Sequence, residues 1–234
     1  MSVMIEHVGD LRHSFGQLDG LALLRALLRD SPLRGQTALV SSFGAESAVL
    51  LDMIATVDPA TPVLFLETGK LFDETLDYRD ELVAHLGLTD VRSVRPAPAD
   101  LLKNDRDGTL HAREPDLCCQ IRKTEPLWQA LDGFQAWITG RKRFHGNLRH
   151  ALPTIEGEVA TGKIKLNPLA RWSAEDIERY RILRDLPAHP LVAEGYRSIG
   201  CAPCTRPTPE GGDARAGRWW GIDKTECGIH GDGI

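Results

Sequence analysis

The chain has 234 residues, of which 42% are hydrophobic and 26% are charged, so it is long enough and apolar enough to bury one sizeable core. Its 28 basic and 33 acidic side chains give a formal net charge of −5, which argues against duplex nucleic acid or an anionic membrane as a partner. No apolar run approaches the roughly 20 residues of a membrane-spanning helix, and the N-terminus lacks the pattern of a signal peptide. We therefore expect a cytoplasmic protein with no nucleic-acid or membrane partner; a homo-oligomer is left open.

Helix-like and strand-like segments alternate along the first part of the chain. Helices are predicted at 21–29, 48–57 and 71–88, and strands at 37–43, 63–68, 90–95 and 137–140. Ser173 and Asp176 carry the signature of a capping box, so a further helix is expected from there to about Leu186. Strands that alternate with helices predict an α/β fold, in which a parallel sheet has helices on both faces.

The composition and the hydrophobic pattern of the sequence divide the chain into three parts. Residues 1–34 form an N-terminal helical segment, and residues 35–199 contain the predicted α/β domain. Residues 200–234 form a C-terminal tail, whose first part is dense in glycine, proline and charge and has no hydrophobic periodicity. Such a composition predicts a loop or a mobile segment.

Two junctions between a strand and a helix are candidates for a ligand site, because open parallel sheets bind ligands at the carboxyl ends of their strands. In the first, residues 41–47 (SSFGAES), Gly44 can adopt a positive φ while Ser42 and Ser47 offer hydroxyl donors. The second is residues 66–70 (LETGK). Neither junction is a Walker A loop, and each could equally be an ordinary turn.

The five cysteines carry a stronger signal. Cys118 and Cys119 are adjacent, and Cys201 and Cys204 have the C-x-x-C spacing that is common for two ligands of one metal centre. Adjacent cysteines do not readily form a disulfide with each other, because their Cα atoms are about 3.8 Å apart. Four thiolates suit a tetrahedral zinc or a [4Fe–4S] cluster, and adjacent ligands fit the four-iron cube better. Buried inert cysteines and a thioredoxin-type redox pair are the alternatives.

Cys227 stands apart from these pairs, in a polar tail with a glycine after it. We expect it to be exposed and mobile with a cation nearby, which are conditions for a reactive thiolate, although an incidental tail cysteine would look the same. Basic residues are also frequent near the cysteines, which suggests a site for a small anion. They are Arg122, Lys123, Arg141, Lys142, Arg143, Arg206, Arg215 and Arg218.

Four blocks of sequence strongly resemble the assimilatory adenylyl-sulfate/phosphoadenylyl-sulfate reductase family. The blocks are SSFGAES at 41–47, ETGKLFDETLDYRDEL at 67–82, CCQIRKTEPL at 118–127, and the stretch from GCAPCTRP to KTECGIH at 200–230. The resemblance implies an adenine nucleotide α-hydrolase-like (PP-loop) fold, with 35–199 as the nucleotide-binding domain. It also implies reduction of adenylyl sulfate to sulfite and AMP, with thioredoxin or glutaredoxin as electron donor.

The resemblance further implies roles for individual residues. Cys227 matches the catalytic nucleophile, and Cys118, Cys119, Cys201 and Cys204 match the ligands of a [4Fe–4S] cluster. The implied substrate-binding residues are Ser42, Phe43, Gly44, Ser47, Glu67, Thr68, Gly69, Lys123, Arg143, Arg215 and Arg218.

One stretch departs from the family pattern. The family commonly reads G-x-R-R-x-Q-S after a strand, whereas residues 140–146 read GRKRFHG, so only Arg143 matches the second arginine. Three alternatives stay open: a reductase of the 3′-phosphorylated nucleotide or of both nucleotides, an ATP-using PP-loop ligase or thiolase, and a zinc-stabilised binding module. The PP-loop enzymes carry an S-G-G-x-D-S loop, which Phe43 and Glu46 interrupt here.

Overall fold

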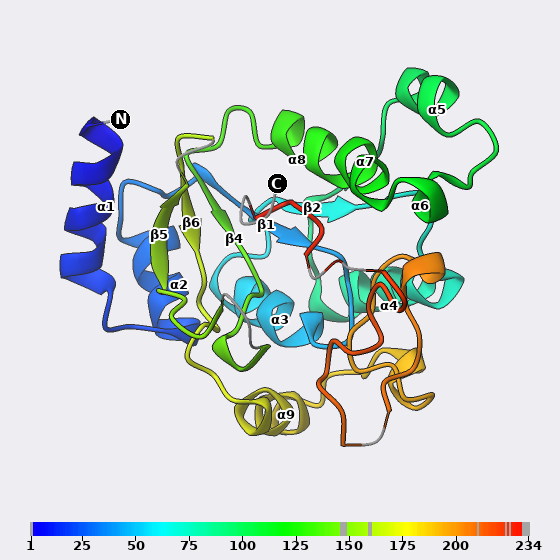
Figure 1. Cartoon of the computed structure of the whole chain (residues 1–234). Coiled ribbons are helices and arrows are strands. Elements are labelled where there is room, and N and C mark those ends of the chain that lie inside the picture. The colour runs from blue at the N-terminus through cyan, green and yellow to red at the C-terminus, as the bar shows by residue number, and fades with distance from the viewer. Residues whose placement is uncertain are drawn as a thin grey trace.

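A mixed, mostly parallel sheet with helices on both faces forms the body of the protein (Figure 1). The computed structural model describes residues 2–145, 149–158, 161–209, 211–222, 224 and 226–230, with side chains from His7 on. The strands are β1 (Thr37–Ser41), β2 (Val63–Leu66), β3 (Val91–Val94), β4 (Ala136–Ile138), β5 (Ile155–Glu158) and β6 (Lys163–Leu166). Their order in the sheet is β3-β2-β1-β4-β6-β5.

The helices surround this sheet. They are α1 (Ser2–Phe15), α2 (Gly20–Arg29), α3 (Ser47–Val57), α4 (Asp73–Leu86), α5 (Pro98–Asn104), α6 (Leu110–Arg113), α7 (Pro115–Cys119), α8 (Glu125–Ala130) and α9 (Ala174–Leu183). A π-helical turn (Gln120–Thr124) joins α7 to α8. Within the described residues, none of the helices combines the length and the hydrophobicity needed to span a membrane.

The predicted fold class is confirmed, with one addition at the edge of the sheet. The pairs β1–β2, β1–β4, β2–β3 and β4–β6 are parallel, whereas β5 runs antiparallel to β6. The sequence analysis did not predict β5, β6 or the helices α5 to α8, and it gave α1 only as part of a helical segment at 1–34. The capping box at Ser173 is present, and the helix it begins ends at Leu183, three residues before the expected end.

Alternate residues of each strand face two separate cores, as the pleat of a sheet requires. Leu39, Phe65 and Ile138 belong to the larger core, which α2, α3 and α4 help to cover. Val40 and Trp137 face the other side, where Leu127 of α8 packs. Figure 1 shows α8 on one side of the sheet and α3, α4 and α9 on the other.

The order of the strands fixes where a ligand can bind. The chain runs outward from β1 to β2 and β3, and then returns to place β4 on the opposite side of β1. The crevice at the carboxyl ends of β1 and β4 is therefore the topological switch point of the sheet, where α/β proteins of this kind bind ligands.

Candidate active site

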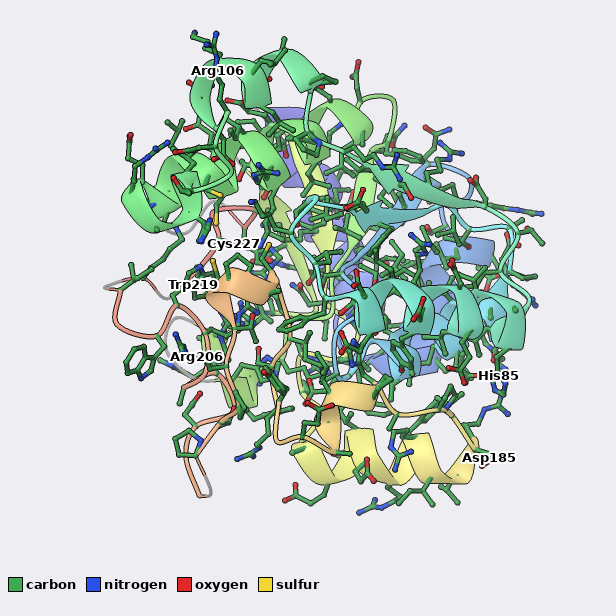
Figure 2. All side chains as sticks on the ribbon, turned by 90° about the vertical axis from the view of Figure 1, so that its right-hand side faces the viewer. His85, Arg106, Asp185, Arg206, Trp219 and Cys227 are labelled. Carbon is green, nitrogen blue, oxygen red and sulfur yellow. The ribbon has the colours of Figure 1, made fainter. Side chains whose placement is uncertain are left out.

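A cavity of about 230 Å³ opens at this switch point. Ser42, which follows β1, and Thr139, which follows β4, both line it. Arg215 and Cys227 of the C-terminal tail line it as well. In Figure 2, Cys227 and Trp219 lie close together between helices α5–α8 above and α9 below. The tail therefore closes one side of the cavity that the sheet begins.

The loop after β1 has a different backbone from the one expected. The positive φ falls on Phe43 (49°), and the Phe43 ring is buried edge-on against Phe65, with 5.3 Å between the ring centroids. Gly44 instead permits a close approach, because a Cβ there would lie 3.1 Å from the carbonyl oxygen of Ile199. Ser42, Gly44 and Ser47 line the cavity, whereas the Phe43 side chain anchors the loop in the core.

The second predicted junction contributes two residues to the cavity wall, Leu66 and Thr68. Thr68 lines the cavity, but Glu67 and Gly69 do not. The Glu67 carboxylate instead accepts a hydrogen bond from the Gly69 backbone N–H (2.7 Å) and pairs with Arg95 (2.8 Å). These two residues shape the loop around Thr68, and neither lies in the cavity wall where a contact with substrate was expected.

Basic side chains dominate the cavity wall. Among the described residues, the basic ones that line it are Lys123, Arg141, Lys142, Arg149, Arg197, Arg215 and Arg218. The carboxylates among the described lining residues are Glu46 and Glu226. The excess of positive charge in a confined space suits an anionic ligand with several charged oxygens.

Arg143, which was predicted to bind substrate, lies outside the cavity wall, and two of its neighbours lie in that wall. Arg143 does not line the cavity, because it begins a 3₁₀ turn and its Nε donates to the carbonyl oxygen of Leu152 (2.9 Å). Arg141 and Lys142, which lie just beyond Thr139 and Gly140 at the end of β4, line the cavity instead. His145 of the divergent stretch also lines the cavity, whereas Gly146 lies outside the described residues.

Glu46 is held ionised beside the loop after β1. Its carboxylate lies 2.7 Å from the Lys142 ammonium and 3.2 Å from Nε2 of His145. Burial alone would raise the pKa of Glu46, but Lys142 and His145 outweigh it and lower the pKa to about 2. Glu46 therefore neutralises part of the positive charge at this end of the cavity, a role that no local motif indicates.

Arg218 is fixed by the loop around it. Its guanidinium carbon lies 4.6 Å from the ring centroid of Trp219, and its Nη1 lies 3.5 Å from the Ser198 hydroxyl. A side chain at Gly200 would overlap the guanidinium, so a larger residue there would displace Arg218 from this position. Trp219 itself is buried. The segment that was expected to be a plain loop is thus packed, with buried residues that orient its arginines.

The two cysteine pairs meet at a second, smaller cavity. Cys118 and Cys119 come from the end of α7, whereas Cys201 precedes a 3₁₀ turn that ends at Cys204, and all four line the cavity. Burial raises the pKa of Cys119 to about 11. The Thr68 hydroxyl lies 3.3 Å from Sγ of Cys201. Within the described residues, no three His, Cys, Asp or Glu side chains converge on one point that could hold a metal ion.

Lys123 connects the two cavities. It lies in the π-helical turn that directly follows α7, and its side chain lines the cysteine cavity and the larger basic cavity alike. Turns of this kind recur at functional sites. Its predicted partners, Arg215 and Arg218, line the larger cavity with it. The three basic residues named from the resemblance are thus brought together by the fold.

Cys227 is half-buried in the cavity wall, so the expected exposure is wrong. Its neighbour Glu226 pairs with Arg149 and lies 3.4 Å from Nη2 of Arg215. The nearby Lys224 ammonium is occupied by the carboxylate of Asp116. Sequence reasoning missed Arg149 and Glu226, since nothing local to either residue marks them.

The fold and the site define an α/β protein of the adenine nucleotide α-hydrolase-like class with a basic cavity and a cysteine in its wall. A model of the family described as "Phosphoadenosine phosphosulfate reductase domain" matches residues 36–207, and the chain belongs to that family. This confirms the resemblance drawn from the four sequence blocks.

Similar proteins agree with this assignment. The chain is 47% identical to a protein of Mesorhizobium japonicum named adenosine 5'-phosphosulfate reductase, over 98% of this chain and 94% of that protein. It is 44% identical to a protein of Gloeobacter violaceus named phosphoadenosine 5'-phosphosulfate reductase, over 80% of this chain and 79% of that protein. A crystal structure of phosphoadenylyl-sulfate reductase from Candida auris in a phosphate complex aligns with a TM-score of 0.71 at 28% identity, covering 86% of this chain and 97% of that one.

A more distant likeness concerns the fold alone. Candida glabrata FMN adenylyltransferase aligns with a TM-score of 0.58 at 18% identity, covering 88% of this chain and 75% of the other. Both chains therefore share the sheet architecture.

Proposed function

We propose that this protein reduces adenylyl sulfate to sulfite and AMP, with electrons from reduced thioredoxin or glutaredoxin, in assimilatory sulfate reduction and cysteine biosynthesis. The observation that carries the proposal is that Cys227 lines the same basic cavity as Arg215 and Arg218. A nucleophilic thiol and an anion-binding wall thus meet at the switch point of a nucleotide-binding fold. A reducing cytoplasm, expected from the sequence, is where such a donor is available.

The first chemical step forms an enzyme S-sulfocysteine. The Cys227 thiolate attacks the sulfuryl sulfur, an S–S bond forms, and the S–O bond to the phosphate breaks, so that AMP departs with the bonding electron pair. Arg215, Arg218 and Lys123 would stabilise the negative charge that develops on the phosphate oxygen. Because these groups are already oriented by the packing of Trp219 and the turn after α7, they need little reorganisation.

The second step releases the product and restores the thiol. A thiolate of the dithiol donor attacks Sγ of Cys227, the S–S bond to the sulfite group breaks, and sulfite leaves with the electron pair. The second thiol of the donor then attacks the mixed disulfide, which frees Cys227 and leaves the donor as a disulfide. The two electrons that reduce the substrate sulfur therefore come from the donor.

The four remaining cysteines fit a [4Fe–4S] cluster. They line one cavity from two separate segments, α7 and the turn at 201–204, and adjacent thiolates suit the four irons of a cluster better than a single zinc. Cys118, Cys119, Cys201 and Cys204 would each hold one iron. When bound, the cluster would supply fixed charge beside Lys123 and a covalent link between α7 and the tail.

Intact-protein mass spectrometry tests the proposal. Protein incubated with adenylyl sulfate, without any thiol donor, should gain the mass of one sulfite unit and lose it again when reduced thioredoxin is added. The matched Cys227→Ser variant should gain no mass but should keep its iron and bind AMP. If that variant produced sulfite at a comparable rate, the nucleophile would have to lie elsewhere.

A second candidate is reduction of 3′-phosphoadenylyl sulfate, or of both nucleotides. It is favoured by the 44% identity to the Gloeobacter violaceus protein, which is named for that substrate. Measuring kcat/KM for both nucleotides on the same preparation decides between the two candidates. A ratio above one for the 3′-phosphorylated nucleotide would replace the first proposal by the second.

A further inference from the structure

The face of the sheet formed by β4 and β6 is covered by the C-terminal tail. Helix α8 lies over β2 and β3 on this side, where Leu127 packs. Further along the same face, Ile229 of the tail packs against the core that contains Trp137. Trp137 and Lys165 are register partners in the parallel pair of β4 and β6, so their side chains emerge side by side.

His230 sits directly on these two residues. Its ring is nearly parallel to the indole of Trp137, with an interplanar angle of 6° and 5.7 Å between centroids. Its carbonyl oxygen accepts a hydrogen bond from the Lys165 ammonium at 3.2 Å. The tail is thus held through both the side chain and the backbone of one residue.

Lys165 is a buried cation whose ammonium is oriented by several neighbouring groups. Its side chain is only 3% exposed, and its ammonium lies 2.6 Å from the Glu158 carboxylate. The same ammonium lies 4.9 Å from the centroid of the Trp137 ring. Glu158 in turn accepts hydrogen bonds from Nε1 of Trp137 (3.3 Å) and from the Thr161 hydroxyl (2.6 Å). The His230 carbonyl is thus one of the groups that satisfy this buried ammonium, and a hydrogen bond from a charged donor is stronger than one between neutral groups.

The position of this contact matters for the thiol. His230 is three residues after Cys227, and three residues span at most about 10 Å of extended chain. Fixing His230 on the sheet therefore restricts Cys227 to the region of the basic cavity. Lys165 does not itself line that cavity, whereas Trp137 and His230 do.

We infer that Lys165 and Trp137 are positioning residues for Cys227: they form a seat on β4 and β6 that holds His230, and through it the thiol, at the cavity. The inference rests on the proposed role of Cys227 as nucleophile. Neither residue contacts the reacting atoms in this scheme. The hydrogen bond from a charged donor and the stacked ring bias the tail toward the position in which Cys227 can react.

Lys165→Met tests the seat, because methionine keeps the length and the packing of the chain but cannot donate a hydrogen bond. Lys163→Met is the matched control, since Lys163 lies on the same face of β6 but donates to the carbonyl oxygen of Phe134 (2.7 Å). The anaerobically purified protein is exposed to iodoacetamide, and the rate of alkylation of Cys227 is read from its tryptic peptide. Single-turnover formation of the S-sulfocysteine and the dissociation constant of AMP are measured on the same samples.

In Lys165→Met we expect alkylation of Cys227 to become about tenfold faster and S-sulfocysteine formation about tenfold slower, the effect of losing one hydrogen bond to a charged group. AMP affinity should stay within about twofold, a change that corresponds to well under one hydrogen bond. Lys163→Met should match the unsubstituted protein in all three measurements, and Lys165→Arg should restore most of the transfer rate. Unchanged alkylation and transfer in a folded Lys165→Met protein would overturn the inference.

A second variant keeps the test decisive if Lys165→Met does not fold. His230→Ala removes the stacked ring from the tail and leaves the sheet intact, and it should also make alkylation of Cys227 faster. An unchanged alkylation rate there would overturn the seat as well. If the unsubstituted protein formed no S-sulfocysteine at all, the proposed function would fail, while the alkylation rates would still decide whether the seat exists.

Discussion

Arg149 and Glu226 lie 77 residues apart in the chain, and their side chains form an ion pair inside the cavity that holds Cys227. Arg215 approaches the same carboxylate, with 3.4 Å between Nη2 and the nearer oxygen. Glu226, the residue before Cys227, therefore pairs with two arginines of the cavity wall that an anionic substrate would also contact. It links the tail to Arg149, and under the proposed function it would compete with the substrate for these two cations.

Glu226→Gln should separate these two effects. Glutamine keeps the shape of the side chain but removes its charge, so Arg149 and Arg215 become more available to AMP and its affinity should rise. S-sulfocysteine formation should fall about tenfold, because a charge-assisted anchor of the tail is lost. Isothermal titration with AMP and single-turnover mass spectrometry measure the two quantities.

Glu178→Gln serves as the control, since Glu178 pairs with Arg181 on the exposed surface of α9. Exposed pairs of this kind contribute little. Equal effects of the two substitutions would show that Glu226 has no special role.

Arg218→Ala should weaken AMP binding by about tenfold or more, the expected effect of losing a charge-assisted contact to an anion. It should also lower the free energy of unfolding by about 1 kcal/mol, because the guanidinium stacks on the buried ring of Trp219. Arg206→Ala is the matched control: Arg206 lies 4.9 Å from the centroid of the exposed Trp220, outside the cavity lining. Similar losses of AMP affinity in both variants would contradict the assignment of Arg218 to the anion site.

Cys201→Ser should abolish the iron content and the brown colour of anaerobically purified protein. Cys201 is buried in the cavity that also holds Cys118, Cys119 and Cys204, and serine is a poor ligand for a cluster built on thiolates. Cys227→Ser should keep both properties, because Cys227 lines the other cavity. Iron analysis and the visible spectrum give the answer, and full iron in Cys201→Ser would remove the cluster from the proposal.

We expect the protein to lose stability in mild acid because His189 is buried in its neutral form. It is 1% exposed, and its Nδ1 accepts a hydrogen bond from the backbone N–H of Leu191 (3.2 Å), while its Nε2 lies 3.0 Å from the Thr75 hydroxyl. Burial lowers the pKa of His189 to about 4. The same histidine has a pKa near 6.5 in the unfolded chain. Between pH 4 and pH 6.5 the unfolded chain is therefore protonated at this residue while the native state is not.

The free energy of unfolding should fall as the pH drops from 7 toward 4, by at most about 3 kcal/mol from this group. Urea titrations of the unsubstituted protein and of His189→Gln at several pH values measure the difference. A slope against pH that is the same in both proteins would rule out this origin of the acid sensitivity.

The local elements followed from the sequence wherever local physics decides them. The run of leucines at 21–29, the β-branched segment after Gln36 and the capping box at Ser173 gave helix, strand and helix start, because periodicity and capping act over a few residues. The β5–β6 hairpin was missed: its strands mix polar and apolar residues, and they are stabilised by neighbours in the sheet that the sequence does not show.

For the site, the sequence by itself determined the cysteine pairs, the loop after β1 and the tail that carries Cys227. Only the tertiary structure decided that Arg141 lines the cavity while Arg143 turns to the carbonyl of Leu152. It likewise buried the Phe43 ring. The physical reason is that spacing along the chain limits which residues can meet, whereas the direction of a side chain depends on partners that folding brings from distant segments.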